Sequence, residues 1–151
     1  DPNNMQTITI TQQEVLVQAR KRLHYKGESL KEGDKIQLAT TLQASQDEDD
    51  VLETYAQKAA EKMADALNRT ASTALSLSSG TYTFSITPPS NYDTNQDPLI
   101  KGGIFSYMVN RVIFEWLNIT APELAKSYYE LAAESEADII RRIAKRNKPT
   151  S

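Results

Sequence analysis

The chain has 151 residues, a formal net charge of −3 and no cysteine. This length fits one domain with its own core, and the lack of thiols excludes disulfides and cysteine-ligated metal sites. No stretch approaches the ~18 apolar residues of a membrane span, and so small a net charge gives no argument for general nucleic-acid binding. Residues 1–4 precede Met5 and read as a remnant of expression, so we expect one helical domain over 5–151.

The first half of the sequence predicts three helices. Residues 7–10 alternate, but the run is too short to predict more than an extended arm. A first helix is expected from Thr11, with Glu14 at the capping-box position, to Gly27, a residue type that often ends helices. A short second helix is expected over 34–42. The third, over 46–69, has the clearest period, carried by Leu52, Ala56, Ala59, Met63 and Leu67.

Four carboxylates open the third helix: Asp47, Glu48, Asp49 and Asp50. Adjacent carboxylates on a helix point in different directions, which disfavours a shared cation. The positive end of the helix dipole favours acidic residues at this place. The run therefore predicts a helix start, and its charge makes it a candidate interface.

The period changes after Thr70. Apolar residues then alternate with Ser and Thr on both sides of Ser79-Gly80, at positions Leu75, Leu77, Tyr82, Phe84 and Ile86. This pattern predicts a β-hairpin over 75–87, within a hairpin or loop insertion spanning about 72–98. The alternative is a third helix that continues to about Leu77 and leaves only 82–87 as a strand. Pro88-Pro89 should end that strand, and a polar loop should follow to Pro98.

The last third predicts two long helices, over 101–118 and 121–146. The first carries a wide apolar face made of Ile104, Phe105, Met108, Val112, Ile113, Trp116 and Leu117. Thr120 and Glu123 match a capping box for the second helix, whose apolar side is expected to be Leu124, Tyr128, Leu131, Ile139 and Ile143. We expect the two helices to pack antiparallel and supply most of the core. The fold class is therefore mainly α: a four- to five-helix bundle with a small β-hairpin or extended loop insertion.

No motif in the chain predicts catalysis, a cofactor or a metal. His24 is the only histidine, and no nucleophile motif lies near it. Residues 93–97 begin like a calcium loop, but Pro98 stands where glycine is needed and no carboxylate closes the loop. Gly102-Gly103 is expected to be a hinge from loop to helix rather than a phosphate loop. We therefore expect a protein that is not an enzyme.

Two further features are candidate contact surfaces. Basic residues gather near the C-terminus at Arg141, Arg142, Lys145, Arg146 and Lys148. Compensation of the helix dipole is a sufficient reason for them, but around a ring the same charges would line a channel for DNA. Phe114 lies off the apolar face of its helix, so it is a candidate subunit contact.

The order of these elements resembles the head–tail connector (adaptor) proteins of tailed bacteriophages and prophages. The matching features are the start Thr11-Gln12-Gln13-Glu14-Val15, the alanine-rich helix with an acidic start, the hairpin and the two closing helices. The stretches Tyr128-Tyr129-Glu130-Leu131-Ala132 and Lys145-Arg146-Asn147-Lys148-Pro149 are also similar to such proteins.

The resemblance implies a ring of a dozen or so copies, docked beneath the portal and offering a platform to tail or stopper proteins. It also implies contact with DNA in a channel, and a place in the virion after assembly in the host cytoplasm. No cofactor and no membrane are implied. The alternative function is a helical nucleic-acid-binding or regulatory module that uses Arg20, Lys21, Arg22 and the basic tail.

Overall fold

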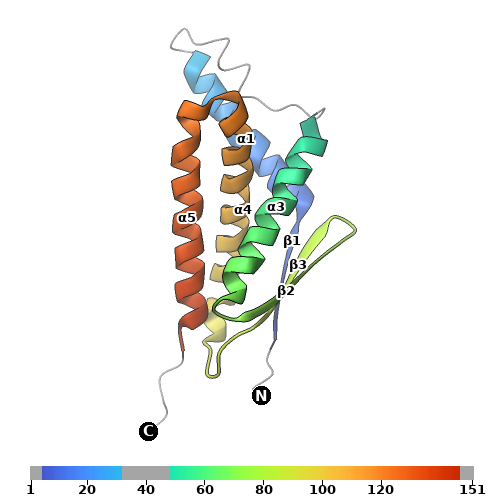
Figure 1. The fold of residues 1–151 in the computed structure, drawn as a ribbon, viewed down its shortest axis with the longest axis vertical. Helices are drawn as coiled ribbons and strands as arrows, with labels where there is room; N and C mark the ends of the chain where they lie inside the picture. Colours follow the sequence, from blue (N-terminus) through green and yellow to red (C-terminus); the bar gives the residue numbers. More distant parts are fainter. Residues whose placement is uncertain (1–4, 32–47, 147–151) are drawn as a thin grey trace.

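The computed structural model describes residues 5–31 and 48–146, with only the backbone of 27–31. Its elements are β1 (Gln6–Thr11), α1 (Gln12–Lys31), α3 (Asp49–Asn68), β2 (Ser72–Ser78), β3 (Thr81–Thr87), a 3₁₀ turn η2 (Thr94–Gln96), α4 (Asp97–Thr120) and α5 (Pro122–Ala144). The helices form a bundle along the long axis, and the sheet lies against one side of its lower half (Figure 1). The predicted helix over 34–42 falls outside the described residues.

Helix α4 is the centre of the fold, in contact with α1, α3, α5 and β1. Its buried side chains occupy several faces of the helix: Ile100, Ile104, Tyr107, Met108, Val109, Asn110, Val112, Ile113, Trp116 and Leu117. A helix that is apolar on most sides is stable in water only when other elements surround it. Helix α5 runs back along α4, so the predicted antiparallel pair is confirmed (Figure 1).

The predicted hairpin is part of a three-stranded antiparallel sheet of order β1-β3-β2. Ser79 and Gly80 both adopt positive φ, as a two-residue hairpin turn requires. Helix α3 ends at Asn68, so the alternative of a longer third helix is wrong. The Asn68 side chain accepts a hydrogen bond from the Thr73 backbone N–H at 2.9 Å, which helps to turn the chain into β2.

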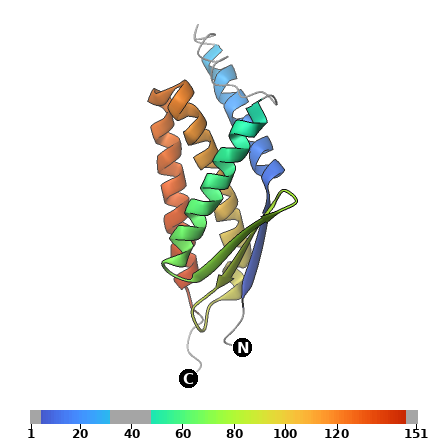
Figure 2. The same ribbon diagram turned by 45° about the vertical axis from the view of Figure 1, so that its right-hand side comes forward.

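Residues 7–10, expected to form only an extended arm, belong to strand β1 of the sheet. Ile8 pairs with Phe84 and Ile10 with Tyr82, far along the chain. These four side chains are buried, so they lie on the inner face of the sheet. This is the face that packs against the helices (Figure 2). The outer face carries mainly hydroxyl side chains, from Thr7, Thr9, Thr11, Ser72, Ser76, Ser78, Thr81, Thr83, Ser85 and Thr87.

Two predicted helix boundaries are wrong. Helix α1 passes through Gly27 and continues to Lys31. Helix α4 begins at Asp97, so Gly102-Gly103 lies inside a helix and is not a hinge. The turn into α4 is made by η2, where the Asp93 carboxylate accepts a hydrogen bond from the Asn95 backbone N–H at 3.0 Å.

The α4–α5 junction also differs from the predicted capping box. Helix α4 includes Thr120, whose hydroxyl donates to the Trp116 carbonyl at 2.9 Å and is therefore no cap for α5. The residue before α5 is Ala121, without a side-chain cap, and Pro122 is the first residue of the helix. Leu131, expected on the apolar side, is 44% exposed, while Ala125 and Ala132 are buried against the bundle. Small residues at these positions let α5 approach α4 closely.

None of the helices within the described ranges is long and apolar enough to cross a membrane.

Candidate functional site

The acidic start of α3 serves the fold in part. Asp49 forms an ion pair with Arg20, which ties the first turn of α3 to α1. Asp50 is exposed, and Glu48 precedes the helix without a side-chain cap. Asp47 lies outside the described residues. The acidic charge that remains available to a partner is therefore smaller than the four residues suggest.

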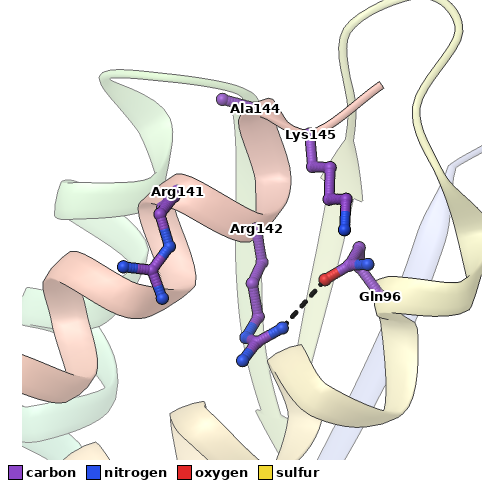
Figure 3. A pocket seen from close by; sticks show the side chains of 5 residues that line it. All are labelled: Gln96, Arg141, Arg142, Ala144 and Lys145. Atoms are coloured by element: carbon purple, nitrogen blue, oxygen red, sulfur yellow. Dashed lines mark hydrogen bonds between the residues drawn. The ribbon is translucent and has the colours of Figure 1, made fainter. Parts of the chain in front are cut away.

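An open pocket of about 530 Å³ lies at the C-terminal end of α5 (Figure 3). It is lined by Gln96, Arg141, Arg142, Ala144 and Lys145. Arg142 donates from Nη1 to Gln96 Oε1 at 3.0 Å and from Nε to Asp138 Oδ2 at 2.8 Å. Lys145 extends toward Gln96 as well, whereas Arg141 lies on the far side of Arg142 from it (Figure 3). Arg141 pairs with Asp138.

Carboxylates offset much of this positive charge. Asp138 contacts two of the arginines, and Asp93 accepts from Gln96 Nε2 at 3.3 Å. The Asp93 backbone N–H also donates to the Lys145 carbonyl at 3.2 Å. Arg146 is exposed, and Lys148 falls beyond the described residues. The pocket is therefore a mixed-charge surface with a modest excess of cations, so it would hold an anion only weakly.

Tyr92, beside this pocket, is one of several tyrosines that link the stability of the fold to alkaline pH. Its hydroxyl donates to Asp97 Oδ1 at 2.6 Å, and burial, with the nearby carboxylate, raises its pKa. Burial likewise raises the pKa of Tyr55, Tyr82, Tyr107 and Tyr128 above 10.0.

We therefore expect the free energy of unfolding to fall as the pH rises above 10. The folded state holds these phenols neutral, whereas in the unfolded chain they ionise near their ordinary pKa. The stabilisation is complete below that pKa and is lost above it. Urea titrations at pH values on either side of 10 measure the effect. An unfolding free energy that does not decrease across this range would contradict the prediction.

Phe114, the predicted subunit contact, packs within the chain. Its ring lies 5.2 Å from that of Tyr129 on α5, and the Arg111 guanidinium sits 5.0 Å and 5.5 Å from the two ring centres. Arg111 is held in turn by Glu115, at 3.1 Å. Tyr129 is 50% exposed and Phe114 is partly buried, so the two rings together offer aromatic surface to a partner.

A surface that the sequence did not indicate lies between α1, α4 and the end of β1. Two adjoining hollows of about 350 and 340 Å³ share Glu14 and Phe105. We call them together the α1–α4 groove. It is open, shallow and mainly apolar, and is lined by Ile10, Gln13, Glu14, Val17, Gln18, Pro98, Lys101, Gly102 and Phe105. Val17 is 48% exposed there.

The other chemical candidates stay apart from one another. His24 is exposed on α1, and Asp93 serves as the cap of η2. Within residues 5–26 and 48–146, no three His, Asp or Glu side chains gather in a way that would hold a metal ion.

The chain matches no protein-family model, no curated protein and no solved structure. The surfaces described above are therefore the basis for a functional proposal.

Proposed function

We propose that this chain is a virion assembly protein: a head–tail connector that forms a ring between the portal and the tail of a phage. The observation that carries the proposal is the α1–α4 groove. A shallow, open and mainly apolar surface suits a segment of another protein better than a small molecule, which is usually enclosed in a deeper cavity. In such a protein the work is done by contacts between chains.

A ring requires two unlike surfaces on each copy, so that every copy binds the next in the same way. The acidic start of α3 and the basic end of α5 carry opposite charges, so they are one candidate pair of surfaces for this contact. They lie at opposite ends of the long axis (Figure 1). Copies standing side by side at equal height would not bring them together. We therefore assign the lateral contact to the groove, and the basic ends of α5 to one rim of the ring, where they would face DNA or the next protein layer.

The direct test is the mass and shape of the full-length chain in solution. Native mass spectrometry and negative-stain electron microscopy over a series of concentrations should give one closed ring of fixed copy number with a central opening. A chain that stays monomeric at every concentration, or that grows into open filaments, would contradict the proposal.

A second candidate, a nucleic-acid-binding or regulatory module, is favoured by the exposure of Arg141, Lys145 and Arg146. The basic part of α1 supports it less, because Arg20 pairs with Asp49 and Arg22 donates to Asn110 at 3.1 Å. Anisotropy of a labelled duplex DNA separates the two functions. Binding by the monomer at about 150 mM salt favours the second candidate, while rings without such binding favour the connector.

A further inference from the structure

Among the described residues, both outer strands of the sheet have an edge without a strand partner, and at the β2 edge only the Thr73 N–H is bound by a side chain, that of Asn68. Strands β1 and β2 each pair only with β3, and neither contains a charged residue, a proline or a glycine (Figure 2). Edge strands of soluble proteins are usually protected by charged residues, by proline or by a bulge, because their free N–H and C=O groups pair readily with another strand. Two unprotected edges on one sheet therefore indicate that strands are added there.

At the β2 edge, part of the apolar inner face of the sheet is left uncovered. Leu75 and Leu77 lie on the inner face, opposite Phe84 and Tyr82 of β3. Whereas those two aromatic side chains are fully buried, Leu77 is 43% exposed. The inner layer thus stops at Leu77 with apolar surface still open to water.

The edge at β1 has the complementary shape. Ile10 is the inner-face residue at the end of β1, and it forms part of the α1–α4 groove with Phe105 and Pro98. The groove therefore continues the inner layer of the sheet beyond β1. One edge of the sheet presents an exposed leucine, and the other presents an apolar hollow.

We propose that the β2 edge of one copy pairs with the β1 edge of the next, so that Leu77 enters the neighbour's α1–α4 groove. This inference rests on the proposed ring and names its lateral contact. Strands β1 and β2 are both antiparallel to β3, hence parallel to each other. A parallel β2–β1 contact can be repeated from copy to copy by one rotation, as a cyclic ring requires.

The competing arrangement is a two-fold pairing of β2 with β2. With Ser76 facing Ser76 of the second copy, it would place Leu77 beside Leu75 of that copy and leave the groove empty. It would also close at two copies and form no ring. The groove beside β1 therefore favours the head-to-tail arrangement.

Cysteine crosslinking tests the contact, because the natural chain has no cysteine. Ser76→Cys is combined in turn with Thr7→Cys, Thr9→Cys or Thr11→Cys, all on the outer face of the sheet, so that three registers are covered. Within one copy β1 and β2 are two strand spacings apart, roughly 10 Å, which is beyond the reach of a disulfide. Crosslinks therefore report contacts between copies.

Under mild oxidation at least one double variant should give a ladder of dimers, trimers and higher species, and the single variants should give none. A ladder in no double variant would overturn the proposal. The single variant Ser76→Cys is the second check. If it forms dimers in the same yield as the double variants, the proposal is overturned in favour of two-fold pairing.

Leu77→Lys supplies a second readout with a matched control. Leu77 and Leu131 are 43% and 44% exposed, so both tolerate lysine without loss of the core. Thermal unfolding followed by circular dichroism checks that both variants fold. Leu77→Lys should abolish the ring, whereas Leu131→Lys on α5 should retain it.

Rings that survive Leu77→Lys and give no crosslinks would refute this contact while leaving the connector proposal intact. A ladder lost with Leu77→Lys, but without closed rings of the natural chain, would support the strand contact and contradict the connector.

Discussion

Replacement of Trp116 by alanine is expected to lower the free energy of unfolding by about 3–5 kcal/mol. The indole is only 9% exposed, and its helix α4 contacts most of the other elements. Its removal leaves a cavity in the core, which neighbouring side chains fill only in part. Domains of this kind are commonly stable by about 5–15 kcal/mol, so the variant should be close to unfolding.

Urea titration followed by far-ultraviolet circular dichroism measures this loss. Fluorescence is unsuitable, because Trp116 is the only tryptophan. Ile119→Ala on the same helix is the control: Ile119 is 72% exposed, and its truncation should change stability by less than about 0.5 kcal/mol. Similar unfolding free energies for the two variants would show that Trp116 does not contribute to the core.

The parts of the fold that the sequence predicts well are those with a local signal. The helical period of α3 and α4 and the alternation around Ser79-Gly80 depend on neighbours a few residues apart. Strand β1 has only a short alternating run, and its partner β3 is distant in the chain: Ile8 pairs with Phe84. Six residues of alternation do not reveal that partner, so the sheet was predicted only as a hairpin.

At the candidate surfaces, too, local features are predictable from the sequence and contacts between distant elements are not. The sequence indicates the charged residues, but some of the partners that bind them come from other elements: Asp49 pairs with Arg20, and Gln96 accepts a hydrogen bond from Arg142. The α1–α4 groove is formed by residues of three elements, so no periodic pattern in the sequence predicts it. Phe114 is off the apolar face of α4, yet α5 supplies Tyr129 to cover it.

The glycine pair in α4 shows why a local rule failed, and it leads to a paired prediction. Gly102 and Gly103 suggested a hinge because glycine weakens helices by about 0.5–1 kcal/mol relative to alanine. A Cβ added at Gly102 would meet no atom within 4 Å, whereas one at Gly103 would lie 2.7 Å from Cγ1 of the buried Ile139. Gly103 is therefore needed for the close approach of α4 and α5.

Gly102→Ala should accordingly raise the free energy of unfolding by about 0.5–1 kcal/mol. Gly103→Ala gains the same helix propensity but adds an overpacking cost of about 1–3 kcal/mol, so it should be destabilising on balance. Because the two positions are adjacent in one helix, the difference between the variants isolates the packing cost. Equal stabilisation by both substitutions would mean that α5 moves aside freely.

A double-mutant cycle with Ile139→Ala identifies the source of that cost. Truncation of Ile139 alone should cost about 2–5 kcal/mol, because the side chain is buried. In the Gly103→Ala background it should cost less, since the added methyl group occupies part of the space that Ile139 vacates and the clash is gone. If the two substitutions were additive, the strain in Gly103→Ala would come from elsewhere than Ile139, and the close contact between α4 and α5 would not be the reason for glycine at this position.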